Sequence, residues 1–231
     1  MSGNVHEGEL VRATPRADGV VEYILRPDEP LKFRPGQFVS VRVGVDSDDN
    51  PILRSYSIAS PPGGPELALI LKLIKGGPGS EFFERLKPGD RVRFTGPMGF
   101  FCLDLQHAGD IVFGVTGVGI TPVLPMISEL AARPERGRIL LYWGNRHAED
   151  LFWLDEFKAL QEKCARLQID SRVGDQSGIV GFYIAWELHF VAWPRHATIV
   201  ASGRTPMGKV VAEEMSLSGA RSRYRPNLLW P

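Results

Sequence analysis

The sequence changes character near residue 105, and this change constrains the fold more than any other feature. Before it, short apolar or alternating runs are separated by turn residues, which is typical of an antiparallel barrel or sandwich. After it, longer units alternate between strand and helix, which is typical of a doubly wound parallel sheet. We therefore predict two domains: an antiparallel β-barrel over residues 1–105, followed by an α/β doubly wound parallel-sheet domain over residues 106–231.

Each half predicts its own set of elements. In the first half we expect strands at Val20–Leu25, Phe38–Val43, Ser55–Ala59, Leu67–Ile74 and Arg91–Phe94, and one short helix at Ser80–Leu86 with Ser80 as its N-cap. In the second half we expect strands at Ile111–Val115, Arg138–Trp143, Leu167–Val173 and Ala197–Ser202, and helices ending at Ala132, near Asp150–Arg166 and from Pro206.

Charge and cysteine content exclude several classes of function. Lys plus Arg number 27, as do Asp plus Glu, so the chain has no net positive charge that would favour binding to nucleic acid. No apolar run approaches the length of a membrane helix, and the start MSGNVHEGEL does not resemble a secretory signal. We therefore expect a cytoplasmic protein with no membrane insertion. Cys102 and Cys164 lie in different predicted domains and cannot form an iron–sulfur site, so no metal is expected in this chain.

The tetrapeptide Arg54-Ser55-Tyr56-Ser57 lies on a predicted strand of the first half. An arginine, an aromatic ring and a hydroxyl at adjacent strand positions can hold a diphosphate, a flat ring and a ring heteroatom. By itself the tetrapeptide fits an ordinary strand with an exposed arginine equally well.

The segment Gly76-Gly77-Pro78-Gly79-Ser80 enters the predicted short helix. Free backbone amides and a hydroxyl at a helix N-terminus form an anion site, although a tight turn with an ordinary cap has the same sequence. The two motifs together favour one shared phosphate ligand.

Two glycine-containing turns follow predicted strands of the second half. Gly114 to Pro122 joins a buried strand to a helix, where glycines let the backbone approach a pyrophosphate and Pro122 suits a first helical turn. Ser202-Gly203 and Met207 form a similar turn, which alone is only a strand-to-helix loop. In an open α/β sheet, two such turns can flank one ligand crevice.

In this order, the four motifs resemble those of the ferredoxin–NADP reductase superfamily, in its bacterial ferredoxin/flavodoxin–NADP reductase type. Arg54, Tyr56 and Ser57 match its RxYS flavin motif, and Gly117–Pro122 is similar to its GTGxxP turn. The resemblance implies an FAD-binding domain and an NAD(P)-binding domain. For FAD it implies contacts from Arg54, Ser55, Tyr56, Ser57, Leu71, Lys72, Gly77, Gly79 and Ser80. For NADPH or NADH it implies contacts from Thr116, Gly117, Val118, Gly119, Thr121, Pro122, Arg146, Ser171, Arg172, Gly203 and Met207.

The function implied by the resemblance is electron transfer between NAD(P)H and a one-electron protein carrier such as ferredoxin or flavodoxin. Ser57 and Ser202 would be the catalytic positioning groups, and the enzyme would be a monomer. Val118 stands where the family usually has Thr, and Ser202 where it has Cys. The alternatives are a reductase subunit of an oxygenase, cytochrome or hydrogenase system, and a non-catalytic flavin- or dinucleotide-binding regulatory protein.

Arginines near the ends of two expected strands favour NADPH over NADH. Arg146 follows the second strand of the parallel sheet, and Ser171-Arg172 comes at the end of the third. A guanidinium can bind a 2′-phosphate through two parallel hydrogen bonds. The alternative is that Arg146 caps a strand end and Arg172 is solvated.

Overall fold

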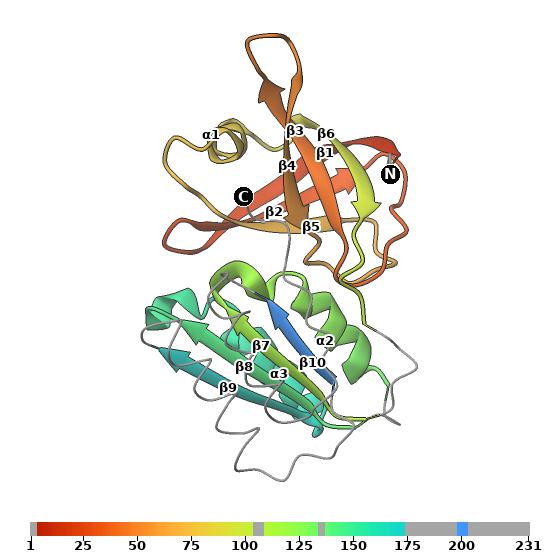
Figure 1. Cartoon of the computed structure of the whole chain (residues 1–231), viewed down its shortest axis with the longest axis vertical. Coiled ribbons are helices and arrows are strands. Elements are labelled where there is room, and N and C mark those ends of the chain that lie inside the picture. The colour runs from red at the N-terminus through yellow and green to blue at the C-terminus, as the bar shows by residue number, and fades with distance from the viewer. Residues whose placement is uncertain (1–3, 104–108, 134–136, 174–197, 203–231) are drawn as a thin grey trace. The chain divides into compact units, whose positions relative to one another are not determined.

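The computed structural model describes residues 4–103, 109–133, 137–173 and 198–202. The chain divides into two compact units, residues 1–103 with 124–126, and residues 104–123 with 127–231 (Figure 1). No helix in the described part of the chain is long and apolar enough to cross a membrane.

The first unit is a six-stranded antiparallel sheet that curls toward a barrel. Its strands are β1 (Val5–Ala17), β2 (Val20–Pro27), β3 (Phe38–Val45), β4 (Pro51–Ser57), β5 (Leu67–Lys72) and β6 (Arg91–Met98), in the order β4-β3-β6-β1-β2-β5. Just after β4, Ile58 forms a bridge with Leu69 of β5, and the Ala59 N–H donates to the Ala68 carbonyl at 2.8 Å. The two edges of the sheet therefore meet at one end, as the barrel prediction required.

The core of this unit is covered by α1 (Pro78–Arg85), which follows β5 and precedes β6 in the chain. Phe83 of α1 is 1% exposed and packs against the rings of Tyr23 (centroids 4.7 Å apart) and Tyr56 (5.1 Å). Helix α1 is thereby held against the strand that carries the Arg54–Ser57 motif.

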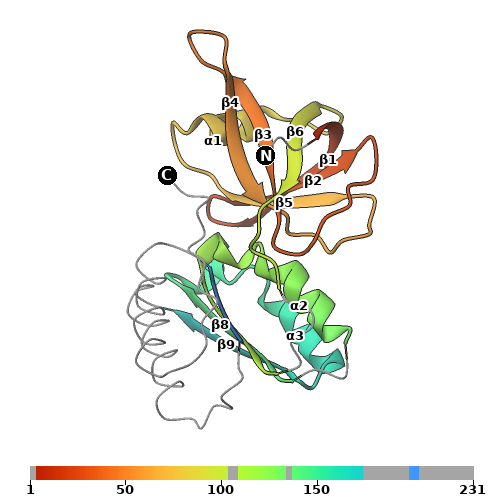
Figure 2. The ribbon, with the colours of Figure 1, turned by 45° about the vertical axis from the view of Figure 1, so that its right-hand side comes forward.

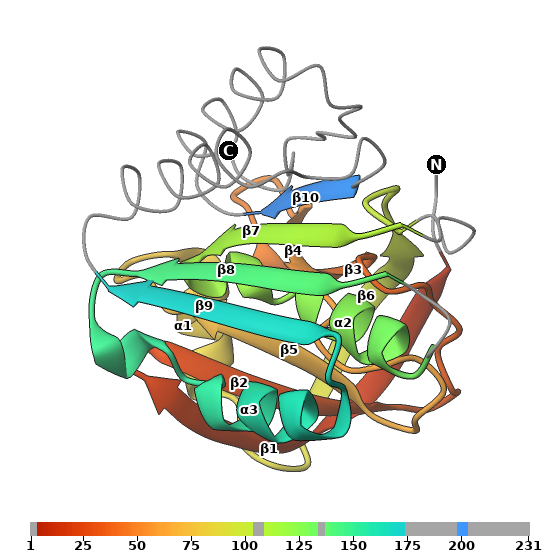
Figure 3. The same cartoon turned by 90° about the horizontal axis from the view of Figure 1, so that it is seen from below.

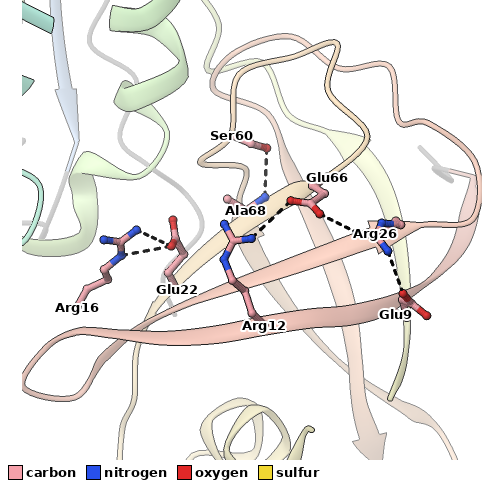
Figure 4. A network of polar contacts seen from close by, with 8 residues as sticks. All are labelled: Glu9, Arg12, Arg16, Glu22, Arg26, Ser60, Glu66 and Ala68. Atoms are coloured by element: carbon pink, nitrogen blue, oxygen red, sulfur yellow. Dashed lines mark hydrogen bonds and ion pairs between the residues drawn. The ribbon is translucent and has the colours of Figure 1, made fainter. Parts of the chain in front are cut away.

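Polar contacts join charged residues of β1 and β2 to one another and to Glu66, which comes just before β5 (Figure 4). Glu66 accepts a hydrogen bond from Arg26 at 3.0 Å and lies 3.8 Å from Arg12; such exposed pairs contribute little to stability. Glu22 differs because it is buried, and Arg16 donates to its carboxylate at 2.7 and 3.2 Å. Removing one partner of the Arg16–Glu22 pair should therefore destabilise the fold more than removing one partner of the exposed pairs.

The second unit is a parallel sheet with the order β10-β7-β8-β9. Its elements are β7 (Ile111–Thr116), η1 (Gly117–Ile120), α2 (Val123–Ala131), β8 (Ile139–Asn145), η2 (Ala148–Asp150), α3 (Leu154–Lys163), β9 (Leu167–Val173) and β10 (Thr198–Ser202). Every residue of β7 and β8 is buried, as expected for central parallel strands.

The order of the strands reverses at β7, and this is the doubly wound feature. Strands β8 and β9 are added on one side of β7 and β10 on the other, as the view from below shows (Figure 3). Helices α2 and α3 lie on the same side of the sheet (Figure 2), as two right-handed crossovers in the same direction require. A ligand crevice is expected outside the carboxyl ends of β7 and β10, where the reversal occurs.

Candidate functional site

In the first unit, the Arg54–Ser57 strand and the start of α1 are in direct contact. A Cβ added to Gly79 would lie 2.3 Å from Oη of Tyr56 and 3.3 Å from Cγ of Arg54. A larger residue at position 79 would therefore have to push these two side chains aside. The two motifs predicted to share a phosphate ligand come together at this point.

The start of α1 presents unpaired backbone donors. Its first residue is Pro78, which has no N–H, and the first helical bond runs from the Glu81 N–H to the Gly77 carbonyl at 2.9 Å. The amides of Gly79 and Ser80 come before that bond, and helix geometry leaves them without intrahelical partners. Together with the positive end of the helix dipole they favour an anion.

Arg54 adds a full positive charge beside these amides. Its side chain is exposed, and Nη1 donates to the adjacent Leu53 carbonyl at 2.8 Å. Its remaining guanidinium donors can form charge-assisted bonds with a diphosphate. The residues present thus fit an FAD diphosphate.

Tyr56 is the half-buried aromatic residue of this site. Its ring meets Phe83 edge-on at 82°. The pKa of Tyr56 is raised to about 12, mainly by burial; the charge of Arg54 opposes this rise and Tyr23 adds to it. The phenol therefore stays neutral and can donate a hydrogen bond throughout the physiological range.

The prediction that Ser80 caps the helix is wrong. The helix begins two residues earlier, its N-cap is Gly77, and no side chain caps it. The Ser80 hydroxyl instead accepts a hydrogen bond from the Ile74 N–H at 2.7 Å. Ser80 therefore closes the loop between β5 and α1, and its backbone amide remains the group that can meet a phosphate.

The other proposed flavin contacts differ in availability. Leu71 belongs to the hydrophobic core, so its side chain is not available to a ligand. Lys72 is exposed, and Nζ donates to the Asp18 carbonyl. Ser55 and Ser57 are partly exposed on β4, where Ser57 pairs with Phe38 at the end of the strand.

In the second unit, the residues Thr116–Pro122 form what we call the glycine turn. Gly117 has φ +52°, a left-handed conformation that favours glycine, and a Cβ there would meet no atom within 4 Å. Thr121 closes the turn, because its hydroxyl donates to the Val118 carbonyl at 2.6 Å. The turn is a 3-10 helix followed by α2, so the α-helix begins just after Pro122.

Trp143 supports this turn from β8 and was missed in the sequence analysis. It is fully buried, it meets Phe152 and Phe157 edge-on, and its Nε1 donates to the Gly117 carbonyl at 3.1 Å. No sequence signal separates a tryptophan with this role from an ordinary core residue of a strand.

The strand ends bring the proposed dinucleotide residues to one edge of the sheet. Ser202 pairs with Val115, directly before the glycine turn, and Ser171 pairs with Trp143. Arg146 is exposed just beyond β8, and Arg172 is the next-to-last residue of β9. The side chains of Ser202 and Arg172, and all of Gly203 and Met207, lie outside the described residues.

Asn145 is a second residue that the sequence analysis missed. The predicted strand ended at Trp143 and left Asn145 in a loop, but β8 continues to Asn145, which is 1% exposed. Within the described part of the chain, neither its Nδ2 nor its Oδ1 has a hydrogen-bond partner.

Two known domain families match this chain. Residues 21–102 match the family "Oxidoreductase FAD-binding domain", and residues 115–180 match "Oxidoreductase NAD-binding domain". Ferredoxin–NADP reductase B of Sorangium cellulosum is 32% identical over 167 residues, 71% of this chain and 68% of that protein. The reductase component DmpP of phenol 2-monooxygenase from Pseudomonas sp. is 33% identical over 139 residues, 59% of this chain and 38% of that protein.

A ferredoxin–NADP reductase from Neisseria gonorrhoeae, solved with FAD and NADP, superposes with a TM-score of 0.79. It is 21% identical, and the match covers 95% of each chain; this likeness shows the fold alone. The matches to reductase components of oxygenase systems span only 38–58% of the length of those proteins.

The fold and the two domain matches define an FAD- and NAD(P)-binding oxidoreductase. The chain belongs to the ferredoxin–NADP reductase superfamily.

Proposed function

We propose that this protein takes electrons from NADPH and passes them, by way of FAD, to a separate one-electron protein carrier, ferredoxin or flavodoxin. The observation that carries the proposal is the contact of Gly79 with Arg54 and Tyr56, since it assembles one flavin site from two distant motifs. We assign residues 1–105 to the FAD-binding domain and 106–231 to the NAD(P)-binding domain.

In this proposal each flavin motif has its own task. Arg54 and the amides of Gly79 and Ser80 hold the diphosphate, while Tyr56 and Ser57 lie beside the flavin ring. FAD, when bound, supplies the exchange between a two-electron hydride and single electrons.

The flavin assignment is tested by mass spectrometry of the released cofactor, where FMN would overturn it. Arg54→Ala should weaken FAD binding by about 1.5–3 kcal/mol, as expected for a charge-assisted contact. Arg42→Ala is the matched control, because Arg42 is an exposed arginine on the adjacent strand β3. Equal FAD affinity in the Arg54 and Arg42 variants would remove Arg54 from the site.

For the dinucleotide, the glycine turn holds the pyrophosphate and Ser202 lies beside the nicotinamide. Holding the nicotinamide and flavin rings in register supplies much of the rate. Ser57 and Ser202 position the rings and move no proton.

The preference for NADPH rests on Arg146 and on Ser171 with Arg172, which hold the 2′-phosphate. Arg146→Ala and Arg172→Ala should lose kcat/KM with NADPH and keep it with NADH. Lys158→Ala, which removes an exposed cation from α3, should change neither. Equal losses with both dinucleotides, or a wild type that prefers NADH, would contradict the assignment.

A second candidate is the reductase component of an oxygenase system, and the names of several relatives favour it. The two are separated by measuring electron transfer to ferredoxins and flavodoxins of the same cell and to its oxygenase components. Reduction of ferricyanide but of no ferredoxin, flavodoxin or cytochrome would contradict the proposed carrier. The monomeric state and the cytoplasmic location stay predictions.

A further inference from the structure

The buried carboxamide of Asn145 lacks the partners that such a group needs. It is 1% exposed, and neither of its polar atoms is hydrogen-bonded to any described residue. A buried polar group without a partner costs about 1–3 kcal/mol, and native proteins pair nearly all of them. At a ligand site, an orphaned group of this kind indicates a partner that arrives with the ligand.

Its place in the sheet puts Asn145 on the side of the glycine turn. Side chains alternate along a strand, so Asn145 faces the same way as Trp143, whose Nε1 donates to the Gly117 carbonyl. Its neighbour Gly144 pairs with Thr116, the first residue of that turn. Residues 146–149 are exposed, so the carboxamide lies where the chain leaves the sheet.

This place has a defined role in dinucleotide-binding folds. In a βαβ unit that binds a dinucleotide, the residue near the end of the second strand contacts the adenosine ribose, and an acidic residue there selects NAD. Here the unit is β7-α2-β8, and its second strand ends at Asn145. A carboxamide carries both donors and an acceptor and has no charge to repel a 2′-phosphate.

We propose that Asn145 is the residue that reads the adenosine ribose of the bound dinucleotide. Its Nδ2 donates to the 2′-oxygen, whether this belongs to a phosphate or to a hydroxyl, and its Oδ1 accepts from the neighbouring hydroxyl. The proposal rests on the proposed function, because it deepens the assignment of the dinucleotide to the glycine turn. Beside Arg146 and Arg172, which are proposed to hold the 2′-phosphate, the carboxamide of Asn145 is a neutral group that does not repel it.

The test measures binding of NADP⁺ and NAD⁺ to the FAD-loaded protein by titration calorimetry, together with the melting temperature in their absence. Asn145→Asp should weaken NADP⁺ binding by about 10- to 100-fold relative to NAD⁺, since the new carboxylate meets the 2′-phosphate. Asn50→Asp, which makes the same change in the exposed turn between β3 and β4, should leave the ratio unchanged.

Asn145→Leu is a second variant that tests the proposal even if Asn145→Asp fails to fold. Leucine has a similar volume and leaves no orphaned group, so the melting temperature without dinucleotide should stay the same or rise. Binding of both dinucleotides should nevertheless weaken, by about tenfold. A lower melting temperature with unchanged dinucleotide affinity would show a purely structural role and overturn the proposal.

Binding of the two dinucleotides to the wild type separates a failure of the proposed function from a failure of the role of Asn145. If the wild type binds neither NADP⁺ nor NAD⁺, the proposed function fails and this inference fails with it. If the wild type binds a dinucleotide but Asn145→Asp leaves the NADP⁺ to NAD⁺ ratio as it was, only the role of Asn145 is overturned.

Discussion

Gly79→Ala tests the assembly of the flavin site most sharply. The added methyl group would lie 2.3 Å from Oη of Tyr56 and 3.3 Å from Cγ of Arg54. Unstrained contacts to carbon lie at about 3.5 Å, so the methyl group and the hydroxyl must separate by about 1 Å. Overpacking of this kind costs about 1–3 kcal/mol.

The cost should appear in FAD binding more than in folding. Arg54 is exposed and Tyr56 is half-buried, so both can move away from α1, and the flavin contacts move with them. The dissociation constant for FAD should rise about 5- to 150-fold, the equivalent of that strain. Titration of the flavin-free protein with FAD, followed by flavin fluorescence, measures it.

Two further variants make the result specific. Gly64→Ala is the matched control, because its Cβ would meet no atom within 4 Å, and FAD affinity should not change. In a Tyr56→Phe background the methyl group loses its 2.3 Å contact and meets Cζ at an ordinary 3.6 Å, so Gly79→Ala should cost less affinity there. An alanine variant that binds FAD like the wild type, or a cost equal in both backgrounds, would refute the reasoning.

Three other predictions concern the support of the glycine turn, the protonation of Tyr56 and the stability of the first unit. Trp143→Phe removes the indole donor beneath the glycine turn, so dinucleotide affinity should fall about 2- to 10-fold in calorimetry while FAD affinity stays unchanged. The pKa of Tyr56 is raised from 10.0 to about 12, so this group leaves stability unchanged below about pH 10 and lowers it between about pH 10 and 12, where only the unfolded chain releases the proton. Urea unfolding across that range should show the fall in the wild type and a smaller one in Tyr56→Phe. Arg16→Met removes the hydrogen-bond donor of the buried Glu22 carboxylate and should lower the free energy of unfolding by about 1–3 kcal/mol. The control Arg12→Met, at an exposed pair, should change the free energy of unfolding by less than about 0.5 kcal/mol.

The architecture could be predicted because the two halves of the chain differ in pattern. The first half has short apolar or alternating runs separated by turn residues, and the second half has longer units that alternate between strand and helix. Strand β1 was nevertheless missed. Its 13 residues include Pro15 and several charges, and only Gly8 and Leu10 are buried, so no clean alternation marks it. Pairing with both β2 and β6 forms this strand, and that pairing is not visible in local sequence.

The site residues that could be predicted are those whose backbone conformation or close contacts require a particular residue type. The residues that were missed owe their roles to how the strands pack. The glycines of the turns were recognisable because the conformation of Gly117 and the close approach at Gly79 demand them. Trp143 and Asn145 gave no signal, since asparagine after a strand ordinarily indicates a turn. Their roles depend on strand register, which places both beside the glycine turn.

The central claim is that this chain binds FAD and accepts electrons from NADPH, and an anaerobic titration tests it directly. The protein is saturated with FAD, freed of excess flavin and titrated with NADPH while the flavin absorbance is recorded. We predict a yellow protein whose flavin band is bleached as NADPH is added and returns on admission of ferredoxin or flavodoxin. A protein that retains no FAD, or a bound flavin that neither NADPH nor NADH bleaches, would contradict the claim.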